Sequence, residues 1–180
     1  MIIRTFVSID VPVSDEMREL LAELDCRKNV RVTDTEQIHL TLKFLGDTDD
    51  KKVQKLCQSL KIALEGQKPF EVIVEGMGGF PNACRPRVIW LGVKDPYRLK
   101  EMAGIVDNCV KELNLNCDDK RFSPHITVGR VNGSTDIEDL VSSCKGKVLC
   151  TFRCDHVNVM ESKLYPKGAV HSVIERIPLS

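Results

Sequence analysis

The sequence predicts an α+β protein whose sheets are mainly antiparallel. Segments that alternate between apolar and polar residues recur along the chain, as expected of strands with one buried face. Between them lie stretches with apolar residues at helical spacing, which begin at capping residues or at a proline. The 180 residues include 42% apolar residues and no Ser/Gly-rich linker. We therefore expect a single domain over residues 1–180, built as one body or as two closely packed halves.

The chain begins with a predicted strand and a predicted helix. Residues 2–10 alternate, with Phe6 on the polar face of the strand. Ser14 can cap the helix that follows. The apolar stripe of this helix consists of Met17, Leu20, Leu21 and Leu24.

A second strand and helix are predicted next. Residues 38–45 alternate again, and Gly46 is expected to end this strand. Thr48 or Asp49 then opens a helix that finishes near Gly66. Its inward-facing residues are Val53, Leu56, Cys57 and Leu60.

The middle of the chain reads as a pair of strands followed by a helix. The strands are residues 70–76 and 87–93, separated by a loop rich in Gly, Pro and Asn over residues 76–82. Asp95 followed by Pro96 is a typical helix start, with a cap before a proline in the first turn. The buried stripe of this helix consists of Leu99, Met102, Ala103, Val106, Val110 and Leu113.

The last third of the chain is predicted to be mostly strand. Residues 125–131 alternate, and a short helix is expected near residues 135–143. Further strands are expected near residues 147–153, 155–161 and 170–177. These elements complete the α+β pattern.

The charge balance limits the kinds of partner. Lys plus Arg and Asp plus Glu number 26 each, so the chain lacks the global basic field of a protein that coats nucleic acid. If RNA binds, we expect a local cleft that recognises an RNA end. No run approaches the roughly 20 apolar residues that span a bilayer, and the first residues do not resemble a signal peptide. We therefore expect a cytoplasmic protein without membrane contact.

Eight cysteines are many for this length, but none is spaced as a C-x2-C metal motif. Cys150, Cys154 and His156 are the nearest approach to a zinc site, and a zinc-supported structural protein is one hypothesis. The simpler interpretation is that the cysteines are reduced thiols that serve as small apolar residues.

Two His-x-Thr motifs are the candidates for chemistry. His39 with Thr41, and His125 with Thr127, each lie in an alternating apolar context. Residues two apart in a strand point to the same side, so each histidine projects together with its threonine. Neighbouring strands would thus bring two imidazoles and two hydroxyls to one cleft.

This set of side chains suits displacement at phosphorus without a metal or cofactor. A neutral imidazole can accept a proton from water, a protonated one can donate to the leaving oxygen, and hydroxyls can bind phosphate oxygens. The other two histidines, His156 and His171, lack the threonine and are interpreted as structural or surface residues.

The two motifs together resemble the 2H phosphoesterases. The surrounding segments, His39–Gly46 and Phe122–Arg130, are more closely similar to the RNA 2′,3′-cyclic phosphodiesterases, the LigT-like or ThpR branch once named 2′-5′ RNA ligases. Further similar segments are residues 4–10, 79–82, 86–90 and 161–168. The resemblance therefore extends over essentially the whole chain.

This resemblance implies a bilobal fold, in which two mainly antiparallel sheets flanked by helices enclose a central groove. It implies that His39 is the general acid, that His125 is the general base, and that Thr41, Thr127 and Arg130 hold the phosphate. The implied reaction opens RNA 2′,3′-cyclic phosphate ends, such as those of tRNA fragments, to 2′-phosphates, with 2′-5′ ligation in reverse. We expect a monomer. The alternative is a non-catalytic RNA- or nucleotide-binding module on the same fold.

The sequence departs from the family's pattern at two positions, and two aromatic residues complete the candidate site. His171 stands near the position where the family commonly has an aromatic residue. Arg130 shares the parity of the core-facing residues of its strand, so it reaches substrate only if the strand bulges or twists near Gly129; otherwise it forms a structural salt bridge. Phe6 and Trp90 could each stack a base or pack internally.

Overall fold

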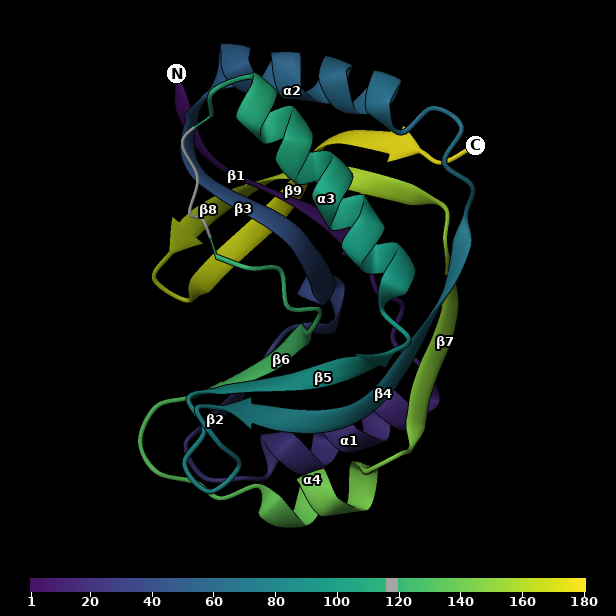
Figure 1. Ribbon diagram of the computed structural model, residues 1–180. Coiled ribbons are helices and arrows are strands. Elements are labelled where there is room, and N and C mark those ends of the chain that lie inside the picture. Colours follow the sequence, from purple (N-terminus) through teal and green to yellow (C-terminus); the bar gives the residue numbers. More distant parts are fainter. Residues whose placement is uncertain (116–119) are drawn as a thin grey trace.

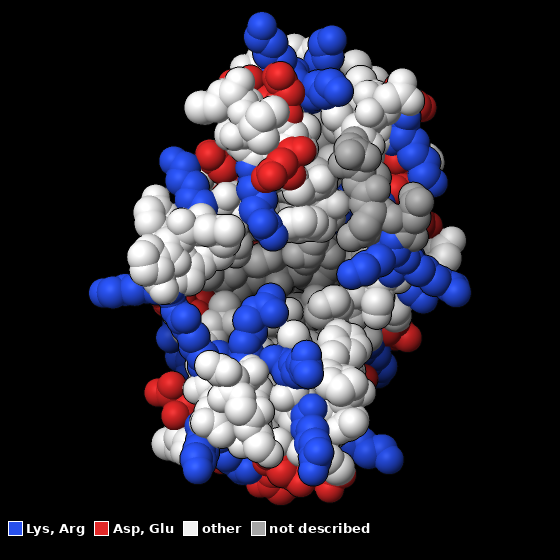
Figure 2. All heavy atoms as spheres, turned by 90° about the vertical axis from the view of Figure 1, so that its left-hand side faces the viewer, with Lys and Arg blue, Asp and Glu red and all other residues white. Residues whose placement is uncertain are grey.

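Two antiparallel sheets, each covered by helices on its outer side, form the two lobes of the protein (Figure 1). The computed structural model describes residues 1–115 and 120–180. The sheet of the first lobe has the strand order β3-β1-β8-β9, and that of the second lobe has the order β2-β6-β5-β4-β7. The predicted α+β class and bilobal arrangement are thus confirmed, and Figure 2 shows a hollow between the lobes.

The elements of each lobe come from both halves of the chain. The first sheet consists of β1 (Ile2–Asp10), β3 (His39–Asp49), β8 (His156–Tyr165) and β9 (Gly168–Pro178). The second sheet consists of β2 (Val30–Val32), β4 (Phe70–Phe80), β5 (Val88–Lys94), β6 (Ile126–Val131) and β7 (Val148–Cys154). The helices are α1 (Asp15–Asp25) and α4 (Glu138–Cys144) on the second sheet, and α2 (Asp50–Ala63) and α3 (Tyr97–Glu112) on the first. A short 3-10 helix, η1, spans Thr35–Gln37.

The alternating residues give each sheet one buried face and one face toward the groove. Leu40 and Leu42 on β3 are at most 3% exposed, whereas the intervening His39 and Thr41 are half-buried on the other face. The predicted helical stripes supply the facing side of each core, and Ser14 accepts a hydrogen bond from the backbone N–H of Met17 as a cap. Among the described helices, none is long and apolar enough to cross a bilayer.

Gly46 does not end the second predicted strand, because β3 continues to Asp49. Gly46 has a φ of +74° and pairs with Thr5, whereas Phe6 already pairs with Phe44. Leu45 is therefore the extra residue of a bulge. Glycine is favoured at the neighbouring position 46, because it adopts a positive φ without strain. Asp49, one of the two predicted caps, accepts a hydrogen bond from the N–H of Lys51 and begins α2.

The glycine-rich segment predicted as a loop is instead the second half of β4, which runs to Phe80. Gly78 carries no side chain, so the ring of Trp90 on β5 can lie directly over it. The predicted cap of α3 was also wrong: Asp95 has a φ of +49°, and Pro96 occupies the position before the first helical residue. The short strand β2 was not predicted.

Candidate active site

The two motif histidines are held in the same way, one in each lobe. His39 is the first residue of β3, and its Nδ1 lies 2.7 Å from the carbonyl oxygen of Gln37. His125 directly precedes β6, and its Nδ1 lies 2.7 Å from the carbonyl oxygen of Ser123. Since a carbonyl oxygen can only accept, each Nδ1 carries the proton and donates it to this bond. Each ring therefore presents Nε2 as the atom available for proton transfer.

The motif threonines share the groove-facing sides of their strands. Thr41 pairs with Ser8 on β1, and Thr127 pairs with Trp90 on β5. Both threonines are half-buried. The strands β3 and β6 that carry the motifs contact each other where the lobes meet. The fold thus brings both motifs to the region between the two sheets.

Three rings pack together around the first motif. The ring centroids of Phe6 and His39 are 5.0 Å apart, those of Phe6 and His171 are 4.9 Å apart, and those of His39 and His171 are 5.2 Å apart. Phe6 is only 2% exposed. Gln37 joins the cluster to β9, because its side-chain oxygen accepts a hydrogen bond of 2.7 Å from the backbone N–H of His171. His171 thus belongs to the surroundings of His39, which the sequence alone did not indicate.

The surroundings of His39 alter its proton affinity. Burial lowers the pKa of His39 below 6.5, and the Gln37 carbonyl and the charge of Asp10 oppose this shift. Asp10 lies opposite His39 in the pairing of β1 with β3. Burial also lowers the pKa of His171, and the charge of His39 lowers it further. A low proton affinity makes the His39 imidazolium a good proton donor whenever it is charged.

His156 pairs with the Asp10 carboxylate. Its Nε2 lies 2.6 Å from Oδ2 of Asp10, and its Nδ1 lies 2.5 Å from Oδ1 of Asp155. The pKa of Asp10 is lowered, because the hydrogen bond from His156 and the nearby charges outweigh the opposing effect of burial. His156 is therefore engaged by two carboxylates, in accordance with the structural role predicted for it.

Two aromatic rings line the groove face of the second lobe beside His125. Phe80 meets the His125 ring edge-on at 5.5 Å and lies 5.3 Å from the ring of Trp90. Phe80 is 42% exposed. The sequence did not single out Phe80, because it stood in a segment predicted as a loop, where strand parity could not be applied.

A bulge brings Arg130 to the groove side of β6. Val88 pairs with Arg130, Ile89 with Gly129 and Trp90 with Thr127, so Val128 has no partner on β5. This extra residue reverses the parity of the strand and places Arg130 on the same face as Thr127. The bulge is one of the two arrangements expected from the sequence. Arg130 is exposed, and among the described residues it forms no ion pair.

The three residues of the hypothetical zinc site do not converge. Cys154 donates weakly to the backbone oxygen of His156, Cys150 donates to that of Pro12, and the His156 ring is occupied by carboxylates. Burial raises the pKa of Cys154 to about 11, which disfavours the thiolate that binds zinc.

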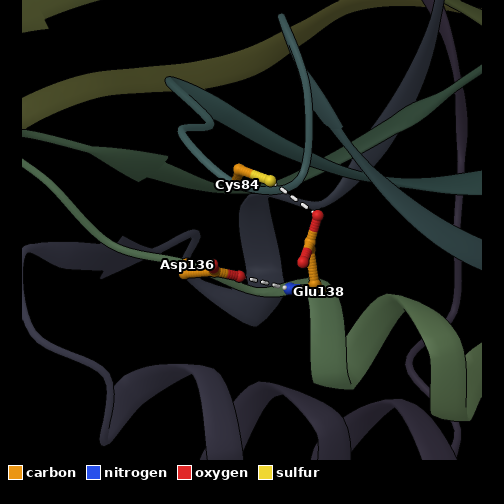
Figure 3. Close-up of side chains that lie close together, drawn as sticks. All are labelled: Cys84, Asp136 and Glu138. Atoms are coloured by element: carbon orange, nitrogen blue, oxygen red, sulfur yellow. Dashed lines mark hydrogen bonds between the residues drawn. The ribbon is translucent and has the colours of Figure 1, made fainter.

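Within the described part of the chain, only one group of three residues has potential metal ligands close together: Cys84, Asp136 and Glu138 (Figure 3). All three are exposed. The Cys84 thiol donates a hydrogen bond of 2.6 Å to Glu138, and the backbone N–H of Glu138 donates to Asp136. These bonds account for the cluster as the start of α4, and it contains no residue of the predicted site.

Comparisons with known proteins identify the family of this chain. Residues 7–90 match the family described as LigT-like phosphoesterases. The RNA 2′,3′-cyclic phosphodiesterase of Archaeoglobus fulgidus is 32% identical over 171 residues, which cover 93% of this chain and 96% of that protein. The enzyme of the same name from Thermotoga maritima is 31% identical over 95% of this chain and 92% of its own length.

The fold is shared with solved structures as well. Escherichia coli LigT in complex with 3′-AMP superimposes with a TM-score of 0.81 at 23% sequence identity, over 100% of this chain and 99% of that one. The near-complete coverage of both chains extends the likeness in fold to both lobes. The chain therefore belongs to the family of LigT-like phosphoesterases.

Proposed function

We propose that the protein hydrolyses RNA 2′,3′-cyclic phosphate ends to 2′-phosphomonoesters, without a metal, by acid-base catalysis with two histidines. The observation that carries the proposal is the matched pair of His39 and His125, each with Nδ1 bonded to a carbonyl and Nε2 available. The names of the full-length relatives support the same substrate. The intact second motif argues against the alternative, a binding module without turnover.

In the proposed reaction, Nε2 of His125 accepts a proton from water as the water oxygen bonds to phosphorus. The bond from phosphorus to the 3′ oxygen breaks, and the 3′ oxygen takes a proton from Nε2 of His39. Thr41 and Thr127 donate hydrogen bonds to the non-bridging oxygens, where negative charge develops. Arg130, which lies on the same face as Thr127, adds a guanidinium to this side of the phosphate.

The surroundings of His39 are compatible with the acid role. Burial lowers the pKa of its imidazolium, and the Asp10 carboxylate favours the charged form. The anionic cyclic phosphate would add a second negative charge beside the ring and favour protonation when substrate is bound. With a 5′-hydroxyl in place of water, the same steps would join two RNA ends through a 2′-5′ linkage, with His125 accepting the hydroxyl proton and His39 giving a proton to the 3′ oxygen.

We also propose that both lobes work as one domain in a reducing compartment such as the cytoplasm. The central strand β1 pairs with β3 on one side and with β8 on the other, so the first sheet requires both ends of the chain. All cysteines in the described part of the chain are free thiols, which is typical of cytoplasmic proteins. The ends of tRNA fragments are among the RNA substrates that this location would supply.

The test uses a short RNA with a 2′,3′-cyclic phosphate end and identifies the product as a 2′- or a 3′-phosphate. We expect a 2′-phosphate, full activity in EDTA, and losses of about 10²–10⁴-fold for His39→Ala and for His125→Ala. Thr41→Val and Thr127→Val should lower kcat, whereas Thr151→Val, at an exposed position on β7, should not. Loss of activity with chelator, or activity retained in both histidine variants, would refute the mechanism. Binding of the RNA without turnover would favour the alternative.

A further inference from the structure

We propose that Arg31 binds the internucleotide phosphate next to the cyclic end of the RNA, so that the neighbouring Arg31 and Arg130 bridge this phosphate and the reacting one. The inference rests on the proposed function, because it names the part of the substrate that lies beyond the reacting phosphate. Nothing in the sequence singled out Arg31, since it lies in the short strand β2, which was not predicted.

The two arginines stand side by side on the groove face of the second lobe. Arg31 on β2 pairs directly with Arg130 on β6, and Arg130 pairs with Val88 on β5. Val88 in turn pairs with Phe80, whose ring contacts His125. Because directly paired residues of antiparallel strands project to the same side, this row of side chains lies on the face that carries the second motif.

The arginine pair has no acidic partner among the described residues. Like charges on directly paired strand residues repel each other, so such a pair is unfavourable unless an anion lies between them. Three other arginines have carboxylate partners, namely Arg27 with Asp139, Arg98 with Glu101 and Arg176 with Asp10. Arg31 and Arg130 are instead both exposed, and Figure 2 shows Lys and Arg side chains around the hollow between the lobes. An anion bound at the pair would remove the repulsion.

The guanidinium of Arg31 contacts the opposite lobe. A Cβ atom built on Gly168 would meet the Arg31 guanidinium at 3.0–3.8 Å, so the group packs directly against this glycine. Gly168 begins β9, in the first lobe, so Arg31 reaches across from one lobe to the other. A side chain that is already positioned loses less conformational freedom on binding, which favours recognition of a ligand.

The position of the pair fits the next phosphate of the substrate. Arg130 lies three residues beyond Thr127, a distance of roughly 10 Å or less along a strand. The cyclic phosphate is at the 3′ end of the RNA. The next charged group along the RNA is therefore the internucleotide phosphodiester. The planar guanidinium fork matches the oxygens of such a phosphate.

The experiment compares two substrates that differ by this one phosphate. Adenosine 2′,3′-cyclic phosphate lacks an internucleotide phosphate, and a dinucleotide with a 2′,3′-cyclic end contains one. We expect Arg31→Gln to raise KM for the dinucleotide roughly 10-fold, in line with the loss of a charged hydrogen bond, and to leave KM for the mononucleotide unchanged. Arg18→Gln, which removes the same charge from an exposed position on α1, should affect neither.

Salt dependence gives a second readout. The slope of log KM for the dinucleotide against log salt should fall by about 0.7 in Arg31→Gln, as expected for one lost phosphate contact to a single strand. Equal effects on both substrates, or no effect on either, would overturn the inference. Binding of the two corresponding 2′-phosphates is measured in parallel, so the site is tested even if the cyclic ends are not hydrolysed. In that case, the missing turnover counts against the proposed function alone.

Discussion

Replacing Gly78 by alanine is expected to displace Trp90 from the groove face of the second lobe. A Cβ atom built on Gly78 would lie 2.2 Å from Cζ2 of Trp90, whereas ordinary van der Waals contacts begin near 3.4 Å. The indole must therefore move by about 1 Å or more, or the pairing of β4 with β5 must open. Because Trp90 pairs with Thr127, either change disturbs the strand that carries the second motif.

The magnitude follows from the contact. Inserting one methyl group into a packed site typically costs about 1–3 kcal/mol, and we expect Gly78→Ala to lower the free energy of unfolding by this amount. Gly104 provides the matched control, because a Cβ atom at this position of α3 would meet nothing within 4 Å. Gly104→Ala should raise the free energy of unfolding by roughly 0.5–1 kcal/mol, since alanine favours the helix.

Two measurements distinguish the expected outcome from its alternative. Urea unfolding followed by circular dichroism gives the free energy change for both variants. Trp90 is the single tryptophan of the chain, so the native emission spectrum reports on this site alone. A Gly78→Ala protein with wild-type stability and an unchanged emission spectrum would show that the contact is not tight and would refute the reasoning.

Two further predictions concern stability. Ser14→Ala should cost about 1–2 kcal/mol in urea unfolding, because the Ser14 hydroxyl caps α1 and also donates to the backbone of Leu149; a cost equal to that of Ser172→Ala at an exposed site would contradict this role. Burial lowers the folded-state pKa of both His39 and His171 below 6.5, so the unfolded chain binds more protons and stability should fall as pH drops from 7 to 5. His171→Phe should make this fall shallower, and an unchanged slope of unfolding free energy against pH would exclude His171 as a contributor.

The sequence was sufficient wherever a residue's role depends on its own strand or helix. Strand parity correctly separated His39 and Thr41 from the buried Leu40 and Leu42, because the two-residue repeat is a property of a single strand. The helical stripes and the Ser14 cap are local in the same sense.

The sequence was insufficient where a partner strand decides the outcome. The parity of Arg130 is reversed by a bulge that exists only in the pairing of β6 with β5. The glycine-rich half of β4 is a strand because it pairs with β5 and the Trp90 ring covers Gly78, not because of its own propensity. Similarly, the proximity of His171 to His39 requires β9 to meet η1 through the Gln37 side chain, a contact between residues that are far apart in sequence.

The two lobes supply histidines in the same hydrogen-bonding arrangement, so the arrangement alone cannot decide which of them is the acid. Their neighbours differ. His39 is enclosed by Phe6 and His171 and lies opposite the Asp10 carboxylate, whereas the ring contact of His125 is the edge of the exposed Phe80. In the proposed mechanism, burial lowers the pKa of the His39 imidazole, the Asp10 carboxylate and an anionic substrate favour its protonation, and the proton then passes to the leaving oxygen. These side chains, which surround only His39, support the proposal that His39 is the acid, as the family resemblance implied.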